Sequence, residues 1–409
     1  MNVLDCARRI GVRPMVAGFA LAGLALSSAA TAEPAPLPTP TPAPACWTKD
    51  ALAAKSGEEK IQKWVARAFV EPPPRTKAAY ADITPQVGVI RRVKLKPGDK
   101  RIALTFDLCE QPDEISGYQG TIVDFLRQSG TKATFFMGGK WMLTHRERAQ
   151  QLMSDALFEV GNHTWEHHNL RLFKGQALIG EIRNAQLAYQ EVRGELETKQ
   201  CTRPGTGRLA YEQAQPALSL FRFPFGACDG KSLEAVAGMG LQAIQWDVSA
   251  GDPSPGLSAA HMAHDVLEAV HPGSIVLFHA NGRGWRTPEA LPDIVAHLKA
   301  QGYTFVTVSQ LMAAGEPEIT DRCYDVRPGD ADKYDAFARR LELQYQRAKA
   351  IFAASAHGAA NATEIHAQRH PALQDGVDTP NVEQQGNAAS KKPPREPMPV
   401  APPRTEGGL

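Results

Sequence analysis

Three of the 12 histidines in this 409-residue chain lie within six positions, in the stretch GNHTWEHHNL at residues 161–170. Two of them, His163 and His167, are four residues apart, and on a helical turn this spacing places both imidazoles on the same face. Neutral imidazole is a frequent ligand of zinc, so the pair is a candidate metal site. The spacing alone is a weak signal, and a polar loop that binds no metal explains this stretch equally well.

Other side chains with reactive chemistry stand in or at the ends of short apolar runs. Asp107 closes RIALTFD and His279 closes IVLFH, while Arg222 lies in LFRFPFG and Asp247 in LQAIQWDV. A carboxylate and an imidazole that face one substrate can act as general base and general acid. Each residue alone has a structural explanation, such as a cap, an ion pair or a buried hydrogen bond. Their joint position favours one shared site.

The elements that would bring these residues together alternate along residues 96–315. Seven runs rich in β-branched and aromatic residues predict strands at residues 101–107, 132–138, 157–163, 220–226, 241–248, 273–280 and 303–309. Between most of them, apolar residues recur every three or four positions, which predicts helices at residues 121–130, 143–156, 177–196, 232–240, 259–270 and 288–302. This alternation indicates an α/β fold, a distorted (β/α) barrel of about seven strands. In such a barrel the carboxyl ends of the parallel strands meet at one rim, where the reactive side chains would converge.

Five motifs in this region can be compared with a known family. TFDLCE, HTWEH, RFPFG, WDVSAGD and LFH follow one another in this order along the chain. In type, order and spacing they resemble the motifs of the polysaccharide deacetylases, the NodB-homology enzymes of carbohydrate esterase family four. The resemblance covers residues 98–312, and it implies the barrel-like NodB-homology fold for that region.

The resemblance implies a role for each matching residue. Asp107 is expected to be the general base, His279 the general acid, and His163 and His167 two ligands of a divalent metal, with zinc the expected ion. Arg222 is expected to orient the base. The other residues implied to bind or orient the substrate are Pro224, Gly226, Trp246, Asp247 and Leu277.

Two departures from the family pattern leave alternatives open. The first motif usually carries a second aspartate that binds the metal, and here Leu108 stands in its place. Glu110 is the tentative replacement, because in an extended segment its side chain lies on the same side as Leu108; Asp113 or water are the other candidates. In the fourth motif, both Asp247 and Asp252 are present, and which carboxylate serves the acid or the orienting arginine stays open.

The ends of the chain have a different composition from the middle. Three arginines, an apolar run and the sequence ATA before residue 33 predict a secretory signal peptide, hence a periplasmic or secreted protein without an integral membrane span once the signal is cleaved. Retention of this segment as an anchor is the alternative. The predicted organisation is a signal peptide at 1–32, a proline-rich spacer at 33–46, an N-terminal extension at 47–95, the deacetylase domain at 96–315, a helical extension at 316–353 and a disordered tail at 354–409.

Cysteine content and charge narrow the functional classes. Five of the six cysteines follow the predicted signal, and in an oxidising compartment they can pair, with at least one left over. The formal net charge of +1 gives no electrostatic basis for nucleic-acid binding.

The sequence therefore predicts a metal-dependent hydrolase that removes N-acetyl or O-acetyl groups from an acetylated amino-sugar polysaccharide. Peptidoglycan, a chitin-like polymer and an exopolysaccharide are the candidate substrates. The alternative is a glycan-binding envelope protein that keeps the fold and has lost turnover, for which Leu108 is the main argument. The retained base and acid residues argue against it, because binding alone needs neither.

Overall fold

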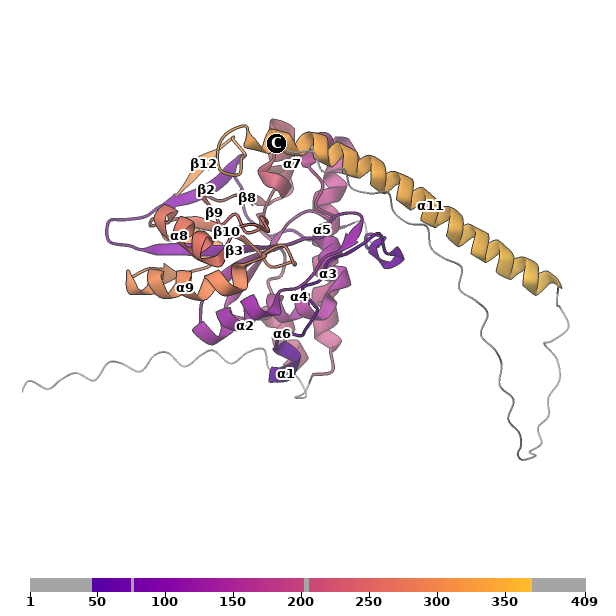
Figure 1. The fold of residues 1–409 in the computed structure, drawn as a ribbon, viewed down its shortest axis with the longest axis horizontal. Coiled ribbons are helices and arrows are strands. Elements are labelled where there is room, and N and C mark those ends of the chain that lie inside the picture. The colour runs from indigo at the N-terminus through magenta and orange to yellow at the C-terminus, as the bar shows by residue number, and fades with distance from the viewer. Residues whose placement is uncertain (1–45, 75–76, 202–205, 370–409) are drawn as a thin grey trace, which may run out of the picture. The chain divides into compact units, whose positions relative to one another are not determined.

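The computed structural model of the protein describes residues 46–74, 77–201 and 206–369, which are coloured in Figure 1. The predicted signal peptide, the spacer up to residue 45 and the tail from residue 370 lie outside the described residues. The chain divides into two compact units, residues 1–343 and 344–409, and every candidate site residue belongs to the first. No helix among the described residues is long and apolar enough to cross a membrane.

A curled, mostly parallel sheet positions the site. Among the described residues, nine strands form its path in the order β12-β2-β8-β7-β6-β5-β3-β10-β9, and β11 pairs separately with β3. The longer parallel strands at its centre are β3 (Arg101–Leu108), β5 (Ala133–Met137), β6 (Phe158–Asn162) and β10 (Ile275–His279). The others are β2 (Val89–Lys94), β7 (Leu220–Phe221), β8 (Gln242–Ile244), β9 (Val248–Ser249), β11 (Thr304–Phe305) and β12 (Glu316–Thr320). A separate antiparallel pair joins β1 (Gln62–Lys63) to β4 (Glu114–Ile115).

The predicted α/β fold with a distorted, barrel-like sheet is confirmed. All seven predicted runs contain strand residues, but the run at 220–226 forms only the two-residue β7. Its second half turns instead, because Pro224 has no N–H for a ladder and Phe225 adopts a left-handed conformation with φ +60°. The sequence did not predict β2, which carries three basic residues, or β12, which contains Pro317 and pairs antiparallel with β2.

Helices surround the sheet (Figure 1). They are α1 (Lys49–Leu52), α2 (Gly120–Ser129), α3 (Gly139–Thr144), α4 (Arg146–Met153), α5 (Gly175–Thr198), α6 (Thr206–Gln213), α7 (Gly230–Gly238), α8 (Ala259–Ala269), α9 (Thr287–Ala300) and α10 (Val308–Met312). A further helix, α11 (Lys333–Arg369), follows β12 along the chain and is not one of these. Local signals set several ends: Asp229 forms a capping box with Ser232 at the start of α7, and Gly130 ends α2 in the left-handed conformation. The helix predicted at 143–156 is broken at His145, whose φ of −124° is not helical.

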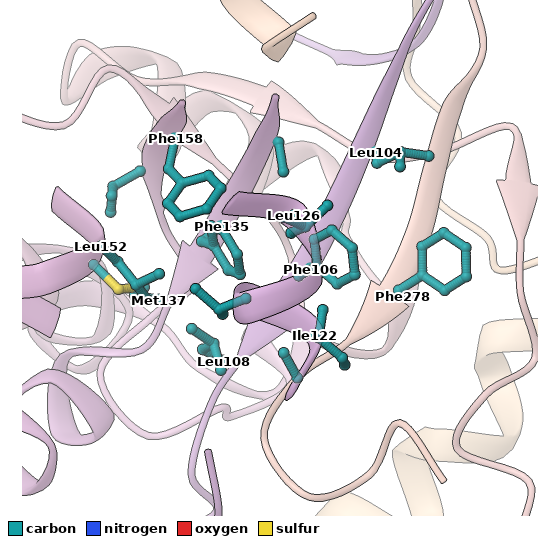
Figure 2. Packing of buried hydrophobic residues seen from close by; sticks show 14 of the residues in the cluster. Leu104, Phe106, Leu108, Ile122, Leu126, Phe135, Met137, Leu152, Phe158 and Phe278 are labelled. Carbon is teal, nitrogen blue, oxygen red and sulfur yellow. The ribbon is translucent and has the colours of Figure 1, made fainter. Parts of the chain in front are cut away.

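An apolar cluster fixes the position of β3. Phe106 is fully buried and stacks between Phe135 of β5 and Phe278 of β10, with ring centroids 5.3 and 5.4 Å apart, and Leu104 and Leu108 join the same cluster (Figure 2). Successive side chains of a strand point to opposite faces, so Thr105 and Asp107 emerge on the other face of β3. Core packing therefore determines which way Asp107 points.

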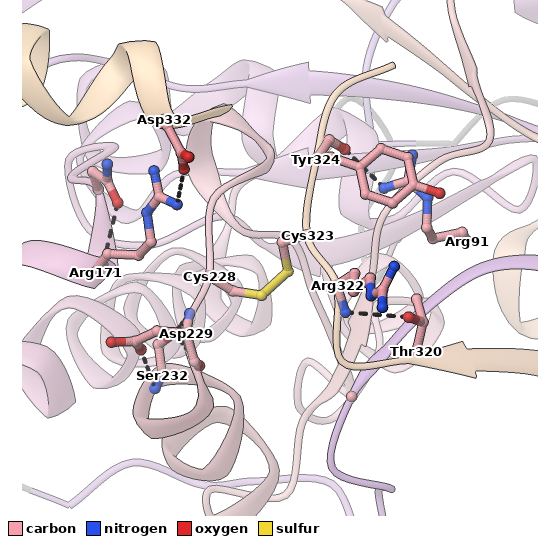
Figure 3. Close-up of a disulfide and its surroundings, with 12 residues drawn as sticks. Arg91, Arg171, Cys228, Asp229, Ser232, Thr320, Arg322, Cys323, Tyr324 and Asp332 are labelled. Carbon is pink, nitrogen blue, oxygen red and sulfur yellow. Dashed lines mark hydrogen bonds and ion pairs between the residues drawn. A yellow bond between two sulfur atoms is a disulfide. The ribbon is translucent and has the colours of Figure 1, made fainter. Parts of the chain in front are cut away.

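The segment that follows β12 returns to the barrel and is attached there. A disulfide joins Cys228, just before α7, to Cys323, and the neighbouring Tyr324 accepts a hydrogen bond from Arg91 through its carbonyl (Nη1–O 2.8 Å; Figure 3). Arg171 forms an ion pair at 2.7 Å with Asp332, immediately before α11. These contacts hold the start of α11 against the unit that carries the site.

Helix α11 extends to Arg369, beyond residue 353, where we expected the helical extension to give way to a disordered tail. Residues 354–369 are rich in alanine, which has the highest intrinsic helix propensity and needs no apolar face to favour a helix.

Of the cysteines that the structure describes, four pair and one is free. Cys46 bonds to Cys201, and Cys228 bonds to Cys323. Cys109 is buried and unpaired. The sequence predicted one cysteine left over, but not which.

Candidate active site

Asp107 is held by a buried arginine. Arg222, directly after β7, donates from Nη1 to Asp107 Oδ1 at 2.8 Å and to Thr105 Oγ1 at 2.8 Å. Burial raises the pKa of Asp107, but the charge of Arg222 and the neighbouring histidines outweigh this effect, so the pKa lies below its ordinary value. Asp107 is thus an ionised carboxylate in a fixed orientation, as a proton acceptor must be.

His163 and His167 come together on a loop, not on the helical turn that their spacing suggested. His163 follows β6 directly, and the backbone then passes through left-handed conformations at Thr164 (φ +66°) and His167 (φ +59°). The Thr164 hydroxyl accepts from the backbone N–H of His167 at 3.0 Å and holds the turn. This loop places the two imidazole centroids 5.0 Å apart.

Both imidazoles have a nitrogen without a hydrogen bond. His163 Nδ1 lies 2.9 Å from the Arg222 carbonyl, which can only accept, so Nδ1 carries the proton and the lone pair is on Nε2. Among the described residues, neither His163 Nε2 nor His167 Nδ1 has a hydrogen bond, although both atoms are buried; His163 Nε2 lies 3.3 Å from Asp107 Oδ2, but with its proton on Nδ1 it has none to donate. Burial lowers the pKa of both histidines, so they are neutral at physiological pH. Two neutral, buried and unsatisfied imidazole nitrogens fit a metal ion as their missing partner.

The side chain of Cys109 lies close to the two imidazoles. It follows Asp107 by two residues and so emerges on the same side of the chain, whereas Leu108 between them packs into the apolar core. One ligand atom each from Cys109, His163 and His167 lie within 4.8 Å of one another. The donor types, one sulfur and two imidazole nitrogens, suit zinc.

Glu110, our tentative third ligand, points away from the histidines. Its Oε1 accepts from the Ser116 backbone N–H at 3.1 Å and from Thr144 Oγ1 at 2.7 Å. Glu110 shares a side of the chain with Leu108, as we expected. That side is the protein interior and not the site. Burial raises the pKa of Glu110 to about 7.

His279 and Asp252 form the second half of the site. In the parallel ladder between β10 and β3, His279 is paired with Asp107, so the two side chains emerge next to each other. His279 Nδ1 lies 2.8 Å from Asp252 Oδ1, while Asp252 Oδ2 accepts from the His279 backbone N–H at 2.6 Å and from Thr287 Oγ1 at 2.8 Å. Burial lowers the pKa of His279, but the charge and hydrogen bond of Asp252, together with Asp107, raise it above its ordinary value overall.

Asp252 is therefore the carboxylate that serves His279, and Asp247 is not part of the site. Asp247 accepts from Ser274 Oγ at 2.9 Å and from the Ile275 backbone N–H at 2.8 Å, and it forms an ion pair with His271. It lies at the amino end of β10, whereas the site lies at the carboxyl end. Asp247 does not line the pocket described below, so the structure lends no support to its predicted substrate-orienting role.

These groups open onto one pocket of about 500 Å³. Five of the residues that line this pocket were predicted from the sequence to belong to the site: Asp107, His167, Trp246, Leu277 and His279. Pro224 and Gly226 shape the turn that presents Phe225 to the pocket. Gly226 has φ +60°, and a Cβ there would lie 3.1 Å from the carbonyl carbon of Tyr324, so glycine permits both the turn and this close approach.

Several pocket residues were not predicted from the sequence. Asp325, Tyr334 and Phe337 come from the segment after β12, and the rings of Tyr334 and Phe337 lie 5.2 and 6.3 Å from the ring of Phe225. Their helical spacing suggested packing and gave no sign of the pocket. Arg283, shortly after the LFH motif, also lines the pocket, and its buried Nη1 has no hydrogen-bond partner in the described chain.

His168, the third histidine of the opening stretch, lies apart from this pocket. Its Nε2 is 3.1 Å from Glu166 Oε1, and the two carboxylates of Glu166 and Glu181 are close to it. Burial lowers its pKa, but Glu181 and Glu166 raise it to about 9, so His168 is a charged, paired residue.

Comparison with known proteins agrees with this geometry. The polysaccharide deacetylase family model matches residues 94–244. A peptidoglycan-N-acetylglucosamine deacetylase of Bacillus cereus is 30% identical over 219 residues, which are 52% of this chain and 89% of that protein. Peptidoglycan-N-acetylglucosamine deacetylase PgdA of Listeria monocytogenes is 28% identical over 247 residues, which are 58% of this chain and 46% of PgdA. The matched region thus spans about half the length of PgdA.

Among solved structures, a peptidoglycan N-acetylglucosamine deacetylase in complex with a substituted benzamide is similar over 56% of this chain and 94% of its own, with 22% identity and a TM-score of 0.46. The fold and the arrangement at the strand ends define an α/β protein with a candidate active site at the carboxyl edge of its sheet. The sequence relationship makes the assignment specific: this chain belongs to the polysaccharide deacetylase family.

Proposed function

We propose that the protein is a metal-dependent hydrolase that removes acetyl groups from an acetylated amino sugar in an envelope or secreted polysaccharide. The observation that carries this proposal is the convergence of three units on one pocket. They are the Asp107–Arg222 pair, the donor group around His163 and the Asp252–His279 pair. A base, a metal site and an acid within one cavity are what hydrolysis of an amide requires.

The residues would hold a divalent ion through the unsatisfied nitrogens of His163 and His167. When bound, the ion supplies Lewis acidity that polarises the acetyl carbonyl and lowers the pKa of water from 15.7 toward about 7. Asp107 accepts the proton of the attacking water. Arg222 keeps this carboxylate ionised and prevents it from rotating away from the pocket.

The acid step belongs to His279. As water oxygen bonds to the acetyl carbon, the bond between that carbon and the sugar nitrogen must break, and an amine leaves readily only when it receives a proton. Asp252 accepts from His279 Nδ1 and keeps the ring protonated, so that Nε2–H is the proton to be donated. The products are acetate and a free amino sugar. The need for a protonated leaving group favours an N-acetyl over an O-acetyl substrate.

The pocket wall suits a sugar. Phe225, Trp246, Tyr334 and Phe337 line it, and Phe337 keeps 43% of its surface exposed. Exposed aromatic faces beside polar groups are typical of sites that bind amphipathic ligands. The relatives named above are peptidoglycan deacetylases, which supports a cell-wall glycan as the substrate class.

Two further observations support the proposal. The alternative of a glycan-binding protein without turnover depended on Leu108, and Cys109 now offers a third donor at the site beside the intact base and acid. The two disulfides, Cys46–Cys201 and Cys228–Cys323, support export to an oxidising compartment, either the periplasm or the exterior.

Acetate release from peptidoglycan and from chitooligosaccharide tests the proposal. The metal-loaded protein should release acetate, the chelator-treated protein should not, and added zinc should restore release. Asp107→Asn is the control for contaminating activity, since it keeps the metal donors. If the zinc-loaded wild type releases no acetate from any acetylated glycan, the proposed function is wrong.

A further inference from the structure

We propose that Cys109, as a thiolate, is the third protein ligand of the metal site and takes the place of the carboxylate that the family pattern puts at position 108. This inference rests on the metal dependence in the proposed function. Catalytic zinc sites use three protein ligands and leave one position open for water or substrate. His163 and His167 supply two, so one ligand remains to be identified.

The other candidates for the third ligand are engaged elsewhere. Leu108 has no donor and is fully buried in the apolar core. Glu110 accepts from Ser116 and Thr144 through Oε1, and although its buried Oε2 has no hydrogen bond among the described residues, the donor group around the two histidines does not include Glu110. Asp113 forms an ion pair with Lys63 at 3.4 Å, on the side of the β1–β4 pair.

Cys109 meets the geometric requirements. Its ligand atom and those of the two histidines are mutually within 4.8 Å, and only 3% of its surface is exposed. The alternation of β3, continued by one residue, turns its side chain to the same side as Asp107. The sulfur therefore shares one side of the chain with Asp107 and lies close to both histidines.

A buried free cysteine is often a simple core residue, and the two cases differ in their surroundings. A core cysteine is surrounded by satisfied groups. Here two buried imidazole nitrogens, His163 Nε2 and His167 Nδ1, make no hydrogen bond in the described chain, although His163 Nε2 lies 3.3 Å from Asp107 Oδ2, and each of the two rings has a nitrogen within 4.8 Å of the sulfur. Leaving such atoms unsatisfied is unfavourable, and a bound ion would remove that cost.

One polar side chain reaches the sulfur. Asn281 Nδ2 donates to the Cys109 carbonyl at 2.8 Å and contacts Sγ at 3.4 Å, so one amide fixes the backbone and presents an N–H to the sulfur. Burial raises the pKa of the thiol well above its ordinary value; the charge of Arg283 opposes this, and the carboxylates of Asp107, Glu114 and Glu110 add to it, so Cys109 is a neutral thiol until an ion binds. Zinc deprotonates a thiol that binds to it. A thiolate and a carboxylate each bring one negative charge, so the exchange preserves the net charge of the site.

Two spectroscopic measurements on the full protein test the assignment without substrate. X-ray absorption of the zinc-loaded protein should reveal one sulfur at about 2.3 Å together with nitrogen at about 2.0–2.1 Å. The cobalt(II)-loaded protein should have a near-ultraviolet sulfur-to-cobalt charge-transfer band. A first shell made only of nitrogen and oxygen, or a cobalt protein without that band, would overturn the proposal.

Variants sharpen the test. Cys109→Ala should weaken zinc binding by more than the roughly 10–100-fold that loss of a supporting second-shell partner costs. Cys109→Asp should keep one zinc per chain but lose the sulfur signals, and it shows that loss of zinc in the alanine variant is not loss of fold. Glu110→Gln, in the same loop, is the matched control and should bind zinc as the wild type does. Unchanged zinc affinity in Cys109→Ala would refute the assignment.

The outcomes for metal and for catalysis can be told apart. Sulfur signals without acetate release would uphold the ligand assignment and refute the proposed function. Acetate release by a protein whose metal shell contains no sulfur would uphold the proposed function and refute the ligand assignment.

Discussion

Replacing Asp252 by asparagine is the sharpest test of the proposed acid. The carboxylate accepts from His279 Nδ1 at 2.8 Å, and its side chain is only 1% exposed, so little solvent screens the interaction. Asparagine has nearly the same shape, and its oxygen can still accept from the His279 backbone N–H. Its amide nitrogen then faces Nδ1 as a donor, which favours the neutral ring with Nδ1 as acceptor.

The magnitude follows from the lost charge. An opposite charge within about 4–6 Å of a titrating group shifts its pKa by about 1–3 units. In the wild type this attraction raises the pKa of His279, and an acid catalyst is lost as pH rises through its pKa. Asp252→Asn lowers the pKa of His279, so the basic limb of kcat/KM against pH should move to lower pH by about 1–3 units. At pH values above the wild-type limb, kcat/KM of the variant should be about 10–1000-fold below that of the wild type.

The assay is acetate release across the pH range, with the Thr287→Val variant as the matched control. Thr287 donates to the same carboxylate at 2.8 Å, so its loss leaves the charge of Asp252 in place and the basic limb near the wild-type position. Metal content, measured alongside, should be equal in all three proteins. An Asp252→Asn profile whose basic limb coincides with that of the wild type would refute the assignment of His279 as the acid.

Four further predictions follow from the structure. Asp107→Asn should fold and keep its metal while turnover falls by about 10²–10⁴-fold; near wild-type turnover would exclude Asp107 as the base. Phe337→Ala should raise KM for an oligosaccharide about 5–10-fold, equivalent to about 1–1.4 kcal/mol, with kcat little changed, and a fall in kcat alone would argue against a binding role. Burial lowers the pKa of His145 to about 4, so between pH 6.5 and 4 this residue is protonated in the unfolded chain but not in the folded chain. The free energy of unfolding should therefore fall between pH 6.5 and 4, on the order of 3 kcal/mol in all from this group, and His145→Gln should flatten that decline in urea titrations. Phe106→Ala should cost about 3–5 kcal/mol of stability in the same measurement, and a much smaller loss would contradict the packing that fixes β3.

The parts of the site that lie on strands could be predicted from the sequence. Side-chain alternation and the convergence of parallel strand ends are regular features, and they correctly placed Asp107 and His279 side by side and His163 at the end of β6. Arg222 also lies where the pattern put it, one residue beyond β7. The core pattern that buries Phe106 and Leu108 is the reason for this success, since it leaves only one face for Asp107.

The parts that depend on loops or on distant segments could not be predicted in the same way. Two backbone conformations bring His163 and His167 together: a helical turn and a loop with left-handed residues. The sequence does not distinguish them, and the structure has the loop. Side-chain alternation places Cys109 on the same side of the chain as Asp107, whereas Glu110, the predicted ligand, lies on the side of Leu108. No local pattern connects Phe225 with Tyr334, which are more than 100 positions apart.

The attachment of the segment after β12 has a consequence for how such a protein can diversify. The base, the acid and the metal donors all come from residues 107–279, whereas Tyr334 and Phe337 come from a segment secured by the Cys228–Cys323 bond. In the proposed enzyme, the catalytic groups thus come from one stretch of the gene, while part of the aromatic wall that would contact the glycan comes from a second stretch. The second stretch is free to accumulate substitutions without disturbing the chemistry, because one covalent link and a few ion pairs keep it in place. Exchanging this segment between relatives would then be a route to new substrate preferences on an unchanged catalytic centre.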